Sequence, residues 1–232
     1  MKTIGVLGGL GPQATIDFQQ RVHRVAQQLL PAQGNSGYPP MVVHYCRHPP
    51  VLLDADGRTR FPIQPDPRLL QAAHTLGQLA DFLVVISNGV HLMQPELEQA
   101  ADRPILSMIE VTLAEVARQG WQRVGVLTYI NPQVYALQLE QRGLVWEGID
   151  AALQTPLDAA IMAVMEGRAG TQATEHARSA VKALRARGVD GIILGCTEIP
   201  LLLPNDLDAP DLLNPTALLA EAAVRHAIAT AD

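Results

Sequence analysis

Short apolar runs alternate with longer amphipathic stretches along the chain. Runs of strand length cover residues 3–7, 41–45, 81–86, 105–107, 123–128 and 191–194. Stretches with apolar residues at helical spacing cover residues 14–30, 67–79, 96–101, 109–119, 133–141, 174–187 and 215–229. Continuously apolar strands separated by helices are typical of a buried parallel sheet with right-handed crossovers. The pattern therefore predicts an α/β fold.

A weak internal repeat runs through this pattern. Residues 4–7 match residues 124–127, an offset of 120, and residues 81–88 parallel residues 190–197, an offset of 109. Two matches in the same order favour duplication, so we expect two pseudo-symmetric parallel-sheet α/β domains. We expect an N-terminal domain of residues 1–104 plus 209–232 and a C-terminal domain of residues 105–208. Open α/β sheets bind ligands at the carboxyl ends of their strands, so an active site is expected in the cleft between the halves.

Composition narrows the class of protein. The 232 residues are 48% hydrophobic, and the net charge of −6 comes with 17 basic residues that form no cluster, which argues against a nucleic-acid partner. Two cysteines without a CxxC spacing cannot form a disulfide framework. The start of the chain is too short for a signal peptide, and no apolar run reaches the length of a membrane span. We therefore expect a cytoplasmic protein with no membrane partner.

A glycine-rich turn follows the first strand and opens the first helix. Gly9, Gly11 and Ala14 satisfy the dinucleotide pattern G-x-G-x-x-A, but the second strand ends His44-Tyr45-Cys46-Arg47 without the acidic residue that pattern requires. Pro12 also removes an N–H group that a diphosphate would use. We favour a helix N-terminus that receives a small anion such as a carboxylate. A ligand-free turn and a Rossmann oxidoreductase remain as alternatives.

Candidate chemical groups follow the strands of the internal repeat. Cys196 ends an apolar strand, where the ligand side of a parallel sheet lies, and Glu198 two residues later argues against a wholly apolar setting. The alternative is a buried core cysteine. The matching place in the first half holds Ser87-Asn88-Gly89-Val90-His91. Asn88 can hold a carboxylate, Gly89 permits close backbone approach, and His91 could act as a base or cap the next segment.

A partial metal set occurs at the second strand. His44, Cys46 and His48 would share one face of an extended strand. Pro49 and Pro50 end that strand, and no fourth ligand is evident. We expect no metal site.

The motifs together resemble the cofactor-independent aspartate/glutamate racemase superfamily. Residues 2–12 resemble its N-terminal signature, residues 81–91 its first-half motif, residues 191–203 its cysteine motif and residues 212–222 its closing helix. The resemblance covers essentially the whole chain in the right order. It implies proton transfer at the α-carbon of an acidic amino acid between two thiols, one per domain, without pyridoxal phosphate or any other cofactor. It also implies a homodimer.

The resemblance assigns roles to particular residues. Cys196 is the acid/base on one face of the α-carbon, and Glu198 tunes it or caps the following turn. The groups expected to bind the substrate are Gly9, Gly11, Gln13, Arg47, Asn88, Gly89, Thr128, Thr197 and Glu198. Among these, Arg47 is the candidate for the side-chain carboxylate, because a guanidinium binds carboxylates bidentately.

The chain departs from the family pattern at Ser87, where the first-half cysteine is expected. Serine is a far weaker acid than cysteine, so three readings stay open. Ser87 relays protons slowly, or His91 or Cys46 supplies the second proton. Alternatively, Cys196 alone protonates a carbanion, as in a one-thiol decarboxylase or isomerase of a small dicarboxylate. The alternative to an enzyme is a protein that binds a dicarboxylate or an amino acid without turning it over.

Overall fold

The computed structural model describes residues 1–129 and 132–229. The chain divides into two compact units. Unit 1 contains residues 1–108 and the chain from Leu219 onward, and unit 2 contains Ile109–Leu218. Each unit is built around its own all-parallel sheet, which confirms the expected α/β fold.

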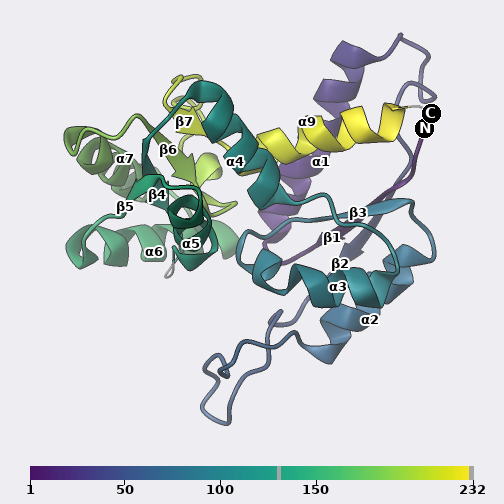
Figure 1. Cartoon of the computed structure of the whole chain (residues 1–232), viewed down its shortest axis with the longest axis horizontal. Coiled ribbons are helices and arrows are strands. Elements are labelled where there is room, and N and C mark those ends of the chain that lie inside the picture. Colours follow the sequence, from purple (N-terminus) through teal and green to yellow (C-terminus); the bar gives the residue numbers. More distant parts are fainter. Residues whose placement is uncertain (130–131, 230–232) are drawn as a thin grey trace. The chain divides into compact units, whose positions relative to one another are not determined.

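Unit 1 has a three-stranded sheet in the order β2-β1-β3. Its strands are β1 (Ile4–Gly8), β2 (Met41–Tyr45) and β3 (Phe82–Val85). Its helices are α1 (Pro12–Leu29), α2 (Pro67–Gly77), the 3₁₀ helix η1 (Gly89–Met93) and α3 (Gln94–Ala101). Figure 1 shows α2 and α3 on one side of this sheet and α1 with α9 (Pro215–Ile228) on the other. The apolar faces of these helices therefore bury both sides of the strands.

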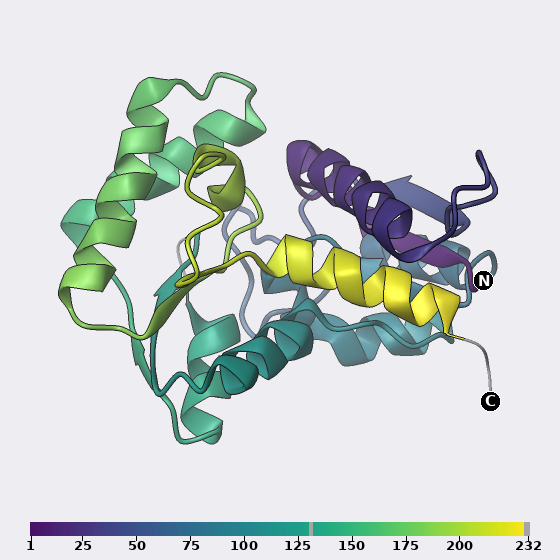
Figure 2. The ribbon, with the colours of Figure 1, turned by 90° about the horizontal axis from the view of Figure 1, so that it is seen from above.

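Unit 2 has a four-stranded sheet in the order β5-β4-β6-β7. Its strands are β4 (Arg123–Leu127), β5 (Val145–Glu147), β6 (Gly191–Leu194) and β7 (Leu212–Leu213). Its helices are α4 (Met108–Gln119), α5 (Gln133–Gln141), α6 (Ala151–Met165), α7 (Thr171–Ala186) and α8 (Ile199–Leu202). One core cluster joins the sheet to α6, α7 and α8, and another joins it to α4 and α5. Figure 2 shows these two groups of helices on opposite sides of the sheet.

The register of the two sheets reproduces the sequence repeat. Ile4 of β1 pairs with Phe82 of β3, and Val124 of β4 pairs with Gly191 of β6. These are the same pairs that the offsets of 120 and 109 residues relate. The backbone continues the match beyond the strands, because Ile86 N donates to Leu7 O at 3.0 Å and Gly195 N donates to Leu127 O at 2.6 Å. Ser87 and Cys196 therefore occupy equivalent positions in the two units.

Some elements differ from the sequence expectations. Residues 105–107 make only an isolated bridge, between Ile105 and Leu83, and form no strand. Residues 209–218 belong to unit 2 and not to the N-terminal domain in which we expected them, because β7 pairs with β6. The pattern also missed α6, β5, α8 and β7. Among the described residues, no helix combines the length and the apolar character that crossing a bilayer requires.

Candidate functional site

Cys196 and Glu198 form a buried pair at the carboxyl end of β6. Cys196 is 8% exposed and Glu198 is 2% exposed. The Cys196 thiol donates a hydrogen bond to Glu198 Oε2 at 3.2 Å, and Thr197 Oγ1 donates to the same oxygen at 2.8 Å. The carboxylate is thus oriented by its two neighbours and lies within proton-transfer reach of the sulfur.

Burial dominates the electrostatics of this pair. Burial raises the pKa of the Cys196 thiol well above its ordinary value, and the nearby Glu198 carboxylate raises that pKa further. Burial likewise raises the pKa of Glu198. The hydrogen bond from the Cys196 thiol lowers the pKa of Glu198 and so opposes the effect of burial. Since the Glu198 charge disfavours a thiolate beside it, the pair carries one negative charge more readily than two. The arrangement can pass a proton between sulfur and oxygen while the pair's total charge stays constant.

A polar network from α6 lies beside the cysteine. Gln154 Nε2 donates to the backbone oxygen of Thr128 at 2.9 Å and to Asp158 Oδ1 at 2.7 Å. Burial, then the charges of Asp158 and Cys196, raise the pKa of Tyr129. The Asp158 carboxylate therefore contributes to the field at the cysteine end of the sheet. A hollow of about 390 Å³ in unit 2 is lined by Val126, Thr128, Pro132, Trp146, Gly148, Ile149, Ala151 and Gln154.

The equivalent segment of unit 1 is braced by a histidine. His91 is 9% exposed, and its Nε2 accepts a hydrogen bond from Met108 N at 3.1 Å. Its Nδ1 must then carry the proton that reaches Ser87 O at 2.9 Å. Burial lowers the pKa of His91 to about 4, so the ring is neutral near pH 7. Both ring nitrogens are engaged by backbone, so the geometry gives His91 the role of fixing the Ser87 backbone and not that of a proton donor.

The residues around Ser87 differ in exposure. Ser87 is half-buried, Asn88 is buried at 4% exposure and Gly89 is exposed. Asn88 directly precedes η1, which begins at Gly89. The structure thus presents the Ser87 side chain at the carboxyl end of β3, as it presents Cys196 at that of β6.

The glycine-rich turn of unit 1 is held by Thr15. Thr15 Oγ1 accepts from Gly9 N at 2.9 Å and donates to Gly11 O at 3.0 Å. Gly9 has φ +77°, and a Cβ there would lie 2.8 Å from the backbone N and O of Cys46. Gly11 is the N-cap of α1, and Gln13 lies half-buried in its first turn. Thr15 was not expected from the sequence, because a threonine inside a helix commonly just donates to the carbonyl four residues earlier.

Cys46 and Arg47 follow β2. Cys46 is 2% exposed within an apolar cluster, and burial raises its pKa to about 11. This setting supports a packing role for its thiol. Arg47 is exposed. Among residues 1–129 and 132–229 no group of three His, Cys, Asp or Glu side chains is arranged to hold a metal ion, His44 and His48 included.

The sequence analysis missed four polar residues of unit 2 that the structure places near the ends of its strands. Gln154 and Asp158 lie on α6, which is so rich in alanine and leucine that its few polar residues were the available signal. Asn214 and Thr216 lie at the start of α9, where Asn-Pro-Thr is a helix-start signature.

The chain thus has two parallel α/β units, with a thiol–carboxylate pair in unit 2 and a serine at the equivalent position of unit 1. The model of the Asp/Glu/Hydantoin racemase family matches residues 7–223, and the chain belongs to that family. It is 24% identical over 230 residues to the broad-specificity amino-acid racemase RacX of Bacillus subtilis, covering 95% of this chain and 96% of that one.

Solved structures show how widely the fold is used. The aspartate racemase of Picrophilus torridus superposes with a TM-score of 0.79 at 19% identity, covering 98% of this chain and 94% of that one. Unliganded arylmalonate decarboxylase superposes with a TM-score of 0.50 at 18% identity, covering 100% and 94%. At these identities the likeness concerns the fold alone. The reaction has to be argued from the residues of the site.

Proposed function

We propose that this chain is an amino-acid racemase or epimerase that exchanges the α-proton through Cys196 without pyridoxal phosphate. The observation that carries the proposal is the Cys196–Glu198 hydrogen bond of 3.2 Å at the carboxyl end of a parallel strand. Membership of the Asp/Glu/Hydantoin racemase family and the similarity to the amino-acid racemase RacX support the reaction type.

The proton transfers balance within this pair. The Cys196 proton moves to Glu198, which leaves a thiolate and a neutral carboxylic acid. The thiolate then takes the α-proton of the substrate and becomes a thiol again, while the substrate becomes a carbanion stabilised through its carboxylate. Return of a proton from the opposite face inverts the centre, and return from Cys196 restores the starting enantiomer.

We assign the opposite face to Ser87, because Ser87 is the residue equivalent to Cys196 in unit 1. A serine hydroxyl is a much weaker acid than a thiol, so inversion is expected to be slower than exchange with retention at Cys196. Aspartate and glutamate are the substrates to test first, with Arg47 as the proposed partner of the side-chain carboxylate. Gly9, Gly11, Gln13, Asn88, Gly89, Thr128 and Thr197 remain the proposed contacts to the rest of the substrate.

The test is interconversion of the enantiomers of aspartate and glutamate, followed by chiral chromatography. The wild type is compared with Cys196→Ala and with Cys46→Ala, which removes the other thiol of the chain. We expect Cys196→Ala to lose conversion and Cys46→Ala to keep it. Conversion that survives in Cys196→Ala refutes the assigned acid/base.

A second candidate reaction is favoured by one observation. Of the two equivalent positions only one carries a thiol, so a thiol can protonate a carbanion from one face only. Decarboxylation of a malonate-type acid needs no more than this. The racemase assignment is replaced by a decarboxylase if the wild type releases CO₂ from a substituted malonate, Cys196→Ala does not, and neither protein converts amino acids. A ligand that raises the melting temperature without turnover by either route indicates a binding protein.

A further inference from the structure

Three buried polar atoms at one edge of the unit 2 sheet have no hydrogen-bond partner among the described residues. They are Glu198 Oε1, Asn214 Nδ2 and Thr216 Oγ1. Asn214 is 9% exposed and Thr216 is fully buried. A buried polar group without a partner costs about 1–3 kcal/mol, so three such atoms in one region call for an explanation.

The orientation of Asn214 is fixed by the helix that it caps. Its Oδ1 accepts from Thr216 N at 3.0 Å and from Ala217 N at 3.2 Å. Exchanging the amide O and N would set an NH₂ group against two N–H donors, so the hydrogen bonds determine which atom is which. Nδ2 therefore points away from the first turn of α9. Pro215 has no N–H, and Thr216 N and Ala217 N are used by the cap, which leaves the two side chains as the available donors.

The sheet register brings these donors close to Cys196. Ile193 pairs with Leu213 in parallel, so Asn214 continues alongside Leu194, two residues before Cys196. With strands about 4.8 Å apart and a rise of about 3.3 Å per residue, the Cα atoms of Asn214 and Cys196 are separated by roughly 8 Å. Ile192 and Leu212 pair across the two strands. Both lie in the core cluster that also contains Leu194 and Cys196, so these residues share one face of the sheet. The alternation of side chains along β7 therefore puts Asn214 on the face of the sheet that carries Cys196.

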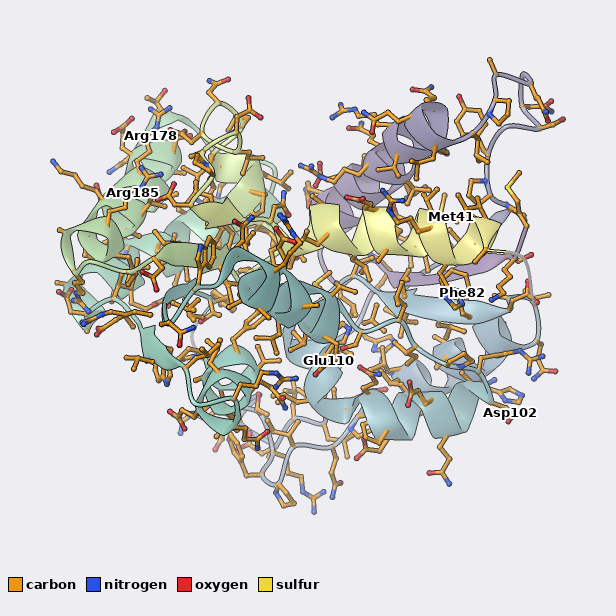
Figure 3. All side chains as sticks on the ribbon, turned by 45° about the horizontal axis from the view of Figure 1, so that its top comes forward. Met41, Phe82, Asp102, Glu110, Arg178 and Arg185 are labelled. Carbon is orange, nitrogen blue, oxygen red and sulfur yellow. The ribbon has the colours of Figure 1, made fainter. Side chains whose placement is uncertain are left out.

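Ion pairs from α7 hold the segment that leads to Asn214. Arg185 makes two hydrogen bonds to Asp211, at 2.6 and 2.7 Å, and Arg178 contacts Asp206 at 3.2 Å. Figure 3 shows both arginines projecting from α7. The start of α9 is therefore anchored through the segment that precedes it.

We propose that Asn214 Nδ2 and Thr216 Oγ1 form a subsite that binds a carboxylate group of the substrate at the N-terminus of α9. Two neutral donors and the positive end of a 14-residue helix suit an anion, and the first turn of α9 contains no acidic residue. The neighbouring Glu198 carboxyl is compatible with a bound anion when it is neutral, which is its state after it takes the Cys196 proton, and burial favours that neutral form. A carboxylate bound here would lie next to the α-carbon that Cys196 deprotonates and would accept charge from the carbanion. The inference rests on the proposed function, since its ligand is the substrate of that reaction.

Two substitutions separate binding from stability. Thr216→Val keeps the shape of the side chain and the backbone cap but removes the hydroxyl. Because that hydroxyl has no partner in the fold, we expect the melting temperature to stay the same or to rise, while carboxylate binding weakens roughly tenfold or more. Asn214→Asp keeps the capping oxygen and replaces the donor with a negative charge, so we expect a stable protein that no longer binds.

Thr112→Val is the matched control. Thr112 is also a fully buried threonine of unit 2, but its side chain hydrogen-bonds to Tyr135. Loss of this hydrogen bond in Thr112→Val should lower the melting temperature and leave ligand affinity unchanged. If Thr216 had only a structural role, Thr216→Val would instead lower the melting temperature and leave ligand affinity unchanged, as we expect of Thr112→Val.

The experiment measures binding by calorimetry in a Cys196→Ala background, where no turnover occurs. The probes are L- and D-aspartate, L- and D-glutamate, and succinate. The inference is upheld if at least one probe binds and the Thr216→Val and Asn214→Asp variants lose it. It is overturned if no probe binds, if the variants bind as the parent does, or if Thr216→Val is destabilised as Thr112→Val is, which would mean that the hydroxyl holds an internal water. If a probe binds and the two variants lose it, but the wild type exchanges no α-proton, the proposed function is refuted and the inferred subsite is kept.

Discussion

Replacement of Glu198 by glutamine tests the proton transfer on which the mechanism depends. Glutamine keeps an oxygen that can accept from Cys196 and from Thr197, which now donate at 3.2 and 2.8 Å, but an amide cannot take the thiol proton. Loss of a positioned base lowers rates about 100- to 10,000-fold, which corresponds to about 3–5 kcal/mol in the barrier. We therefore expect α-proton exchange to fall by that factor.

The same variant should leave the fold intact. Burial raises the pKa of Glu198, so the folded state holds its proton more tightly than the unfolded chain does. The stability that this provides is present below the unfolded pKa near 4.5 and is lost as pH rises through the folded pKa. Glutamine has no such titration. Between pH 7 and 8 the variant should thus be at least as stable as the wild type in thermal unfolding.

The Cys196 thiol provides a further readout. Since the Glu198 charge is, after burial, the largest cause of its raised pKa, the pKa should fall in Glu198→Gln although activity falls too. The pH dependence of Cys196 alkylation, read by mass spectrometry of its peptide, measures this shift. Exchange within about threefold of the wild type, or an alkylation profile that moves to higher pH, refutes the reasoning. Glu110→Gln is the control, because Glu110 is 59% exposed in a surface ion pair with Arg142 and should affect neither readout.

Three other changes have defined outcomes. Ser87→Cys restores a thiol at the position equivalent to Cys196 and should speed inversion about tenfold or more in chiral assays; unchanged inversion in both directions would deny Ser87 its role. Burial raises the pKa of Cys46 from 9.0 to about 11, so the wild type should lose stability as pH rises from 9 toward 11, and Cys46→Ala should flatten that loss in denaturant titrations; an equal slope would contradict it. A Cβ at Gly191 would lie 2.1 Å from the Trp121 ring, so Gly191→Ala should cost about 1–3 kcal/mol, and an unshifted melting temperature would show that the ring moves freely.

The internal repeat in the sequence was sufficient to predict the central strands of both sheets and the equivalence of two site residues. The offset between residues 4 and 124 identified the middle strand of each sheet, and the offset between residues 81 and 190 identified its neighbour. Because parallel register follows from these strands, the equivalence of Ser87 and Cys196 could be predicted before the structure was known. For Glu198 the sequence left two roles open, tuning Cys196 or capping the following turn, and the structure places its Oε2 3.2 Å from the Cys196 sulfur.

Several elements and site residues could not be predicted, because their sequences lack a recognisable pattern or their roles depend on tertiary contacts. The helix α6 is apolar nearly all round and contains Pro156, so it shows neither a clear helical period nor an uninterrupted run. The strand β7 has two residues, which is too short for any alternation to show. Asn214 could be read as a helix cap, but its second amide atom lacks a partner only because of how the chain packs around it. For His91 the sequence left a base and a cap of the next segment as alternatives, because one of its two backbone partners, Met108, lies in a segment that only the fold brings close.

The most direct test of the central claim is proton NMR of each enantiomer of aspartate and glutamate in D₂O with the wild type, reading deuteration at the α-carbon and chirality in the same sample. The account predicts deuteration that is lost in Cys196→Ala. It also predicts that retention outpaces inversion, because a thiol serves one face and Ser87 serves the other. Absence of deuteration with all four amino acids, or deuteration that persists without Cys196, would contradict it.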